Sequence, residues 1–135
     1  MNIRELENAF AAAGKRFVTI GGPEAAAVIA LDIEGRVFTA FNGRIISRVN
    51  QEALTKLSSR NGYVNPGGDG LWAAPEGTCF GYHYCTGSWR VPTGVTSARY
   101  MIVEQHSDSV TVEAEMIWST PGSWLCPAST AVPSA

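Results

Sequence analysis

The chain has 135 residues, of which 45% are hydrophobic and 16% are charged, and its formal net charge is −2. This length fits one domain, and the hydrophobic content argues against disorder over the whole chain. Lysines and arginines are scattered singly and no apolar stretch approaches the ~20 residues that span a bilayer, so we expect neither nucleic-acid binding nor membrane insertion.

The first predicted element is a short amphipathic helix that opens the chain. Asn2 and Glu5 have the spacing of a capping box, in which each side chain satisfies a free amide of the first helical turn. Apolar residues recur at helical spacing from Ile3 to Ala13, and Gly14 follows them as a stop signal. One short helix therefore precedes the strands.

Strand patterns follow this helix and dominate the rest of the chain. Residues 27–31 are apolar throughout, as expected of a strand that is buried on both faces. The dipeptide Asn42-Gly43 readily takes positive φ at both central positions of a tight turn, and it predicts a hairpin. The predicted strands are 16–20, 27–31, 36–41, 44–49, 79–85, 99–105 and 110–116, with one or two helical turns at 51–57 and a hairpin loop at 106–109.

These elements predict a mostly-β fold, an antiparallel β-sandwich with one short N-terminal helix. We expect residues 1–117 to form a single β-rich domain. Residues 118–135 are rich in Ser, Pro, Ala and Thr and carry no charged side chain. Such a composition predicts a loose or aberrant tail.

Candidate binding residues concentrate between positions 65 and 90. Gly67, Gly68 and Gly70 let the backbone turn tightly and approach a ligand, indoles could stack on the C–H face of a sugar, and charged groups could bind hydroxyls. The alternative is that the glycines form turns, the tryptophans fill the core and the charges are solvated. The predicted ligand-binding residues are Asp69, Trp72, Glu76, Trp89 and Arg90.

Three segments carry a resemblance to a known family, namely GRVFT at 35–39, NPGGDGLWAAPEG at 65–77 and WRVP at 89–92. Their succession resembles the N-terminal part of the galactose-mutarotase-like β-supersandwich proteins, closest to an uncharacterised bacterial branch. The resemblance implies a partial supersandwich with a carbohydrate site in a groove on one sheet. Relatives usually carry arginine where Gly70 stands, and their fold needs a longer chain, so it also implies a truncated copy.

Catalysis would require more than this cluster offers. Ring opening of an aldose needs a base for the anomeric hydroxyl and an acid for the ring oxygen. Glu76 and His83 are the local candidates, but their spacing does not indicate a shared target, and the His-Gly-Gly motif of true mutarotases does not occur. The leading hypothesis is a carbohydrate-recognising protein without autonomous catalysis. The alternatives are an aldose 1-epimerase-like or other carbohydrate-processing enzyme completed by homo-oligomerisation through open strand edges, and a non-functional truncated remnant.

Neither a cofactor nor a metal is expected. Cys79, His83 and Cys85 share a face only if their strand is unbulged, and a fourth ligand and a familiar zinc spacing are missing. The three cysteines of the chain form no recognised disulfide framework and are expected to be reduced. The N-terminus lacks the basic patch and apolar run of a secretory signal, so we expect a cytoplasmic protein.

Overall fold

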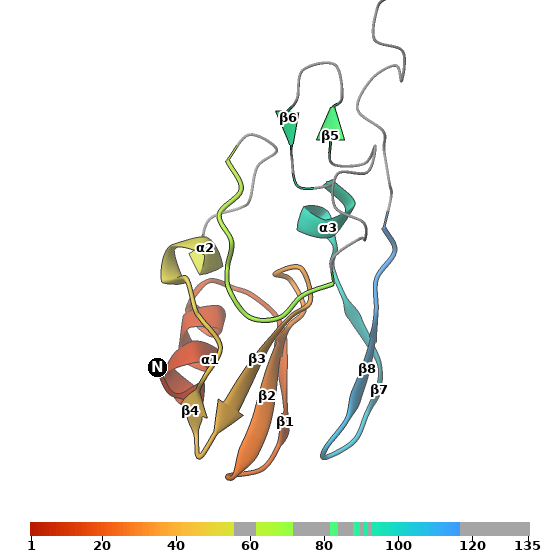
Figure 1. Ribbon diagram of the computed structural model, residues 1–135. Coiled ribbons are helices and arrows are strands. Elements are labelled where there is room, and N and C mark those ends of the chain that lie inside the picture. Colours follow the sequence, from red (N-terminus) through yellow and green to blue (C-terminus); the bar gives the residue numbers. More distant parts are fainter. Residues whose placement is uncertain (56–61, 72–81, 84–87, 90, 92, 117–135) are drawn as a thin grey trace, which may run out of the picture.

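The computed structural model describes residues 1–55, 62–71, 82–83, 88–89, 91 and 93–116. The elements are α1 (Ile3–Ala12), β1 (Phe17–Gly21), β2 (Ala25–Ala30), β3 (Arg36–Phe41), β4 (Arg44–Ile45), α2 (Gln51–Thr55), β5 (Tyr82–His83), β6 (Ser88–Trp89), α3 (Thr93–Ser97), β7 (Met101–Gln105) and β8 (Val110–Glu113). One sheet has the order β1-β2-β3-β4, and β5-β6 and β7-β8 form separate pairs (Figure 1). All pairings are antiparallel, so the predicted mostly-β fold with an N-terminal helix is confirmed.

Helix α1 begins and ends as its sequence predicts. The Asn2 side chain accepts a hydrogen bond from the Glu5 amide, and the Glu5 carboxylate accepts one from the Asn2 amide, each at 2.8 Å. After the helix, Gly14 takes a positive φ of 64°. This turn lets the Lys15 amide donate to the Phe10 carbonyl at 2.9 Å, so free backbone groups are satisfied at both ends of the helix.

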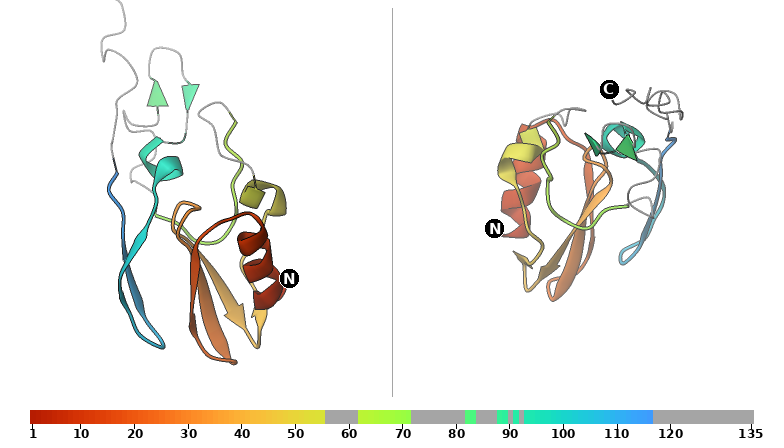
Figure 2. Two further views of the ribbon diagram at one scale, coloured as in Figure 1. Left: turned by 180° about the vertical axis from the view of Figure 1, so that it is seen from behind. Right: turned by 45° about the horizontal axis from the view of Figure 1, so that its top comes forward.

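The four-stranded sheet is covered on both faces. Successive side chains of β2 point to opposite sides, so Val28 and Ala30 face α1 whereas Ile29 and the following Leu31 face the β7-β8 hairpin. Figures 1 and 2 show these layers, with α1 on one side of the sheet and the hairpin on the other. The core beneath α1 comprises Leu6, Phe10, Val28, Ala30, Ile33, Phe38 and Leu54. The opposite core comprises Val18, Ile29 and Leu31, against which Tyr100, Val110 and Val112 pack.

The predicted turn between β3 and β4 is confirmed, but the strand after it is shorter than predicted. Asn42 and Gly43 both have positive φ, at 47° and 73°. Strand β4 ends at Ile45, so the prediction of a strand over 44–49 is wrong beyond that residue. The reason is that the chain leaves the edge of β3 after the Ile46 amide, which donates to the Thr39 carbonyl at 2.9 Å. The Ser47 hydroxyl then accepts the Thr39 amide at 3.0 Å in place of a backbone carbonyl.

The remaining predictions concern the last hairpin, the association of copies through strand edges, the tail and membrane insertion. The last hairpin is present, with β7 and β8 each two or three residues shorter than the predicted strands. Strand β7 exposes Met101, Ile102 and Val103, and among the described elements it pairs only with β8. Association of two copies through strand edges is untested by a single chain and stays a prediction. The predicted tail lies outside the described residues, and among the described helices none is long and apolar enough to cross a bilayer.

The capping box of α1 gives a first testable prediction. Replacing Asn2 with alanine removes the acceptor for the Glu5 amide, and we expect it to lower the free energy of unfolding by about 1 kcal/mol. Asn8 is exposed inside the same helix and offers a matched control. Because alanine is the better helix former there, Asn8→Ala should leave stability unchanged or raise it slightly. Equal losses for the two variants in urea unfolding would contradict the capping role.

Candidate functional site

Residues 66–69 complete the edge of β3 where β4 no longer does. The Val37 amide donates to the Asp69 carbonyl at 2.8 Å, and the Asp69 amide donates back to the Val37 carbonyl at 2.9 Å. On its other side the segment pairs with residues 48–50, because the Gly68 amide donates to the Arg48 carbonyl at 3.0 Å. The segment is therefore held between β3 and the chain that follows β4, and Pro66 within it is fully buried.

Two glycines allow this double pairing. Gly67 has a φ of 87°, and a side chain there would overlap the Arg48 carbonyl oxygen. Gly68 has a φ of 64°, and a Cβ atom would lie 2.8 Å from the Val37 carbonyl oxygen. Both positions require a residue without a Cβ atom. The close approach that the sequence indicated is thus made to the chain's own backbone, and the turn interpretation accounts for both glycines.

A buried polar network lies beneath this segment. Glu34 and Arg36 are only 5% and 7% exposed, and the Arg36 guanidinium contacts the Glu34 carboxylate at 2.8 Å. The Tyr63 hydroxyl accepts a hydrogen bond from Arg36 at 2.6 Å and donates to Glu34 at 3.1 Å. Arg36 also reaches the Gly68 carbonyl at 3.5 Å. Because burial and the nearby Glu34 charge both disfavour the phenolate, the pKa of Tyr63 is raised to about 12.

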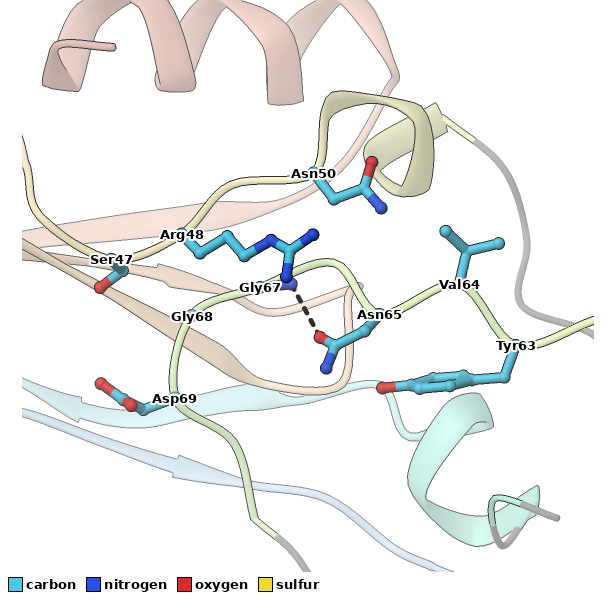
Figure 3. A pocket seen from close by; sticks show the side chains of 9 residues that line it. All are labelled: Ser47, Arg48, Asn50, Tyr63, Val64, Asn65, Gly67, Gly68 and Asp69. Atoms are coloured by element: carbon cyan, nitrogen blue, oxygen red, sulfur yellow. Dashed lines mark hydrogen bonds between the residues drawn. The ribbon is translucent and has the colours of Figure 1, made fainter. Parts of the chain in front are cut away.

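A polar pocket of about 550 Å³ opens above this network. In Figure 3 the Arg48 guanidinium extends between the carboxamides of Asn50 and Asn65, whereas the Asp69 carboxylate is turned toward the opposite side. The ring of Tyr63 forms a further wall. The lining residues are Ser47, Arg48, Asn50, Tyr63, Val64, Asn65, Gly67, Gly68 and Asp69.

Existing hydrogen bonds leave much of this lining free for a ligand. The Ser47 hydroxyl oxygen and the Asn65 carboxamide oxygen already accept backbone amides, at 3.0 Å and 2.9 Å, so their hydrogens remain available. The side chains of Arg48, Asn50 and Asp69 form no hydrogen bond or ion pair within the part of the chain that the structure describes. The pocket can therefore donate and accept hydrogen bonds without breaking contacts of the fold.

The structure describes only some of the predicted site residues. Asp69 is exposed at the pocket, as a binding residue must be. His83 and Trp89 are described in backbone only, where β5 and β6 pair His83 with Ser88 and Trp89 with Tyr82. The remaining predicted residues, Trp72, Glu76 and Arg90, lie outside the described residues. The predicted convergence of these side chains with Asp69 is therefore untested.

Sequence reasoning did not single out five of the side chains that line the pocket, those of Ser47, Arg48, Asn50, Tyr63 and Val64. The first two were assigned to a continuous strand, and nothing local distinguishes them from ordinary exposed strand residues. Their position opposite Asp69 arises from pairing between residues about 20 positions apart, as in the Val49–Gly67 bridge. The grouping of Ser47, Arg48 and Asn50 around the apolar Val49 is the one signal that could have indicated a site here.

Comparison with family models, with curated proteins and with solved structures finds no match to this chain. The resemblance to galactose-mutarotase-like proteins therefore stays a prediction. Among the described residues, no group of three or more histidine, cysteine or acidic side chains is placed to hold a metal ion.

The glycine pairing can be tested with two alanine variants. Gly67→Ala places a methyl group against the Arg48 carbonyl at a positive φ, whereas Gly43→Ala meets positive φ alone, with nothing within 4 Å. Both variants bear the cost of the backbone conformation, so their difference reports the steric overlap. We expect Gly67→Ala to destabilise the fold by about 1–3 kcal/mol more than Gly43→Ala in urea unfolding. Similar losses would show that the segment does not pair so closely.

The raised pKa of Tyr63 predicts a pH dependence at alkaline pH. The folded state holds this proton up to about pH 12, whereas an unfolded tyrosine loses it near pH 10. Between these values the folded state binds more protons, so stability must fall as the pH rises. Tyr63→Phe lacks this titration and should lose less stability than the wild type over the same interval. Tyr100, whose pKa is also raised by burial, is common to both proteins and cancels. Parallel stability curves would contradict the partial burial of the hydroxyl beside Glu34.

Proposed function

We propose that this chain recognises a carbohydrate in the pocket formed by residues 47–50 and 63–69. The observation that carries the proposal is the lining, which combines a hydroxyl, two carboxamides, a guanidinium and a carboxylate beside an aromatic ring. Small-molecule sites typically enclose ~300–1,000 Å³, and a volume of about 550 Å³ suits a mono- or disaccharide. The proposal agrees with the sequence-based expectation for Asp69.

The lining favours a polar ligand because its hydroxyl, carboxamides, guanidinium and carboxylate offer hydrogen-bonding groups on several sides, beside the Val64 side chain and the Tyr63 ring. Sugar hydroxyls both donate and accept, so they match a site in which amides, a hydroxyl and a carboxylate lie together. The Tyr63 hydroxyl is occupied by Glu34 and Arg36, which leaves the ring as the part that a ligand can contact. A ring face of this kind suits the C–H side of a sugar.

Binding without autonomous catalysis is the activity that the described lining favours. Asp69 is its one carboxylate, and no histidine is present among the described residues around the pocket. Anomer exchange requires both an acid and a base within hydrogen-bond reach of one sugar. Catalysis by Glu76 and His83 is an alternative that depends on side chains the structure does not describe.

Calorimetric titration with galactose, glucose and their uronic acids tests the proposal. We expect at least one sugar to bind with a dissociation constant on the order of 1 mM or lower. Asp69→Asn keeps the size of the side chain and the backbone pairing with Val37 but removes the charged acceptor. It should weaken binding by about tenfold.

Asp108 provides the matched control, because it is an exposed aspartate in the β7-β8 loop and does not line the pocket. Asp108→Asn should bind as the wild type does. Flat titrations of folded protein with every sugar, or equal losses for the two aspartate variants, would overturn the proposed site.

A further inference from the structure

The donor and acceptor groups of the pocket are unequal in number. Ser47 and Asn65 have their oxygens occupied by backbone amides, so both offer mainly donors to a ligand. Arg48 can only donate, and it carries five N–H groups. The side-chain acceptors that remain are the carboxylate of Asp69 and the carboxamide oxygen of Asn50. A pocket so rich in donors favours a ligand that is rich in acceptors.

The charges at the site also favour a ligand that is rich in acceptors. Arg36, beneath the pocket, is neutralised by Glu34 at 2.8 Å. Arg48 has no such partner, since no carboxylate among the described residues lies within ion-pair distance of its guanidinium. Asp69 lines the same pocket but is directed away from Arg48 (Figure 3). One end of the pocket therefore presents an unpaired cation beside two carboxamides.

The shape of the cation narrows the choice of anion. A planar guanidinium binds a planar carboxylate through two parallel hydrogen bonds. Its single charge matches that of a carboxylate, whereas a phosphate monoester carries about −1.5 to −2 at neutral pH and would leave charge uncompensated near Asp69. The residues present thus suit a monoanionic ligand with hydroxyls at its other end.

We infer that the ligand of this pocket is an acidic sugar of the uronate class, an inference that rests on the carbohydrate-binding function proposed above. Arg48 binds the sugar carboxylate, and the Asn65 carboxamide donates a further hydrogen bond to it. Asp69, at the other end, accepts hydrogen bonds from ring hydroxyls. Arg48 is therefore the residue that determines specificity between acidic and neutral sugars.

The experiment compares four probes by calorimetry, namely galacturonate, its methyl ester, galactose and galactose 6-phosphate. The ester keeps the size of the acid but removes its charge. We expect galacturonate to bind about tenfold more tightly than its ester or galactose at low salt. The difference in affinity between the acid and its ester should shrink in about 0.5 M salt, because the screening length there is only a few ångströms.

Arg48→Gln should abolish the difference in affinity between the acid and its ester. Arg48→Lys should retain part of it, because lysine keeps the charge but cannot form the two parallel hydrogen bonds of a guanidinium. Arg4→Gln, which replaces an exposed arginine on α1 that does not line the pocket, should leave the difference intact. Thermal melts of each variant confirm that it is folded.

The outcomes separate this inference from the function on which it rests. Equal binding of galacturonate, its ester and galactose would overturn the uronate specificity while supporting a sugar site. Tightest binding of the phosphate would overturn the carboxylate assignment. A preference for the acid that survives Arg48→Gln would overturn the role of Arg48. Absence of binding by all four probes would overturn both proposals.

Discussion

The edge of β3 is the constraint on which the described structure depends. A backbone amide or carbonyl that is buried without a partner is costly, and β4 pairs with only two residues of β3 before the chain turns away. At Thr39 the edge is completed by the Ile46 amide and the Ser47 hydroxyl, and at Val37 by the backbone of Asp69. The same contacts that satisfy β3 therefore place residues 66–68 beside residues 48–50 as a hydrogen-bonded pair, and residues of both segments line the pocket.

The buried network of Glu34, Arg36 and Tyr63 fixes the floor of that pocket. Removing a pair of charges from water is expensive, so a buried ion pair is weak evidence of a gain in stability. Its effect here is positional, because Arg36 joins the turn before β3 to the Tyr63 hydroxyl and the Gly68 carbonyl. Among the described residues no buried side-chain nitrogen or oxygen lacks a partner, so this network is fully satisfied. A network of that kind favours one arrangement of its loops over the alternatives.

Local features of the sequence predicted the fold well, because their causes lie within a few residues. The capping box at Asn2 and the Asn42-Gly43 turn depend on neighbouring residues alone, and the unbroken apolar run of β2 identified the strand that is covered on both faces. The length of β4 could not be predicted, because it depends on which distant segment takes over the edge of β3. For the same reason the sequence indicated Asp69 but not Arg48, whose neighbours in the pocket come from another part of the chain.

The completed edge of β3 also has a bearing on self-assembly. Residues 66–69 cover part of a strand edge that would otherwise offer unpaired amides and carbonyls to another molecule. Pairing Val37 with Asp69, which is distant in the sequence, costs more chain entropy than forming the hairpins of the sheet from adjacent residues. Transient release of residues 66–69 would thus expose this strand edge to other molecules and open the pocket at the same time. A ligand that contacts both segments of the pocket would stabilise the paired state and so lower the population with an open strand edge.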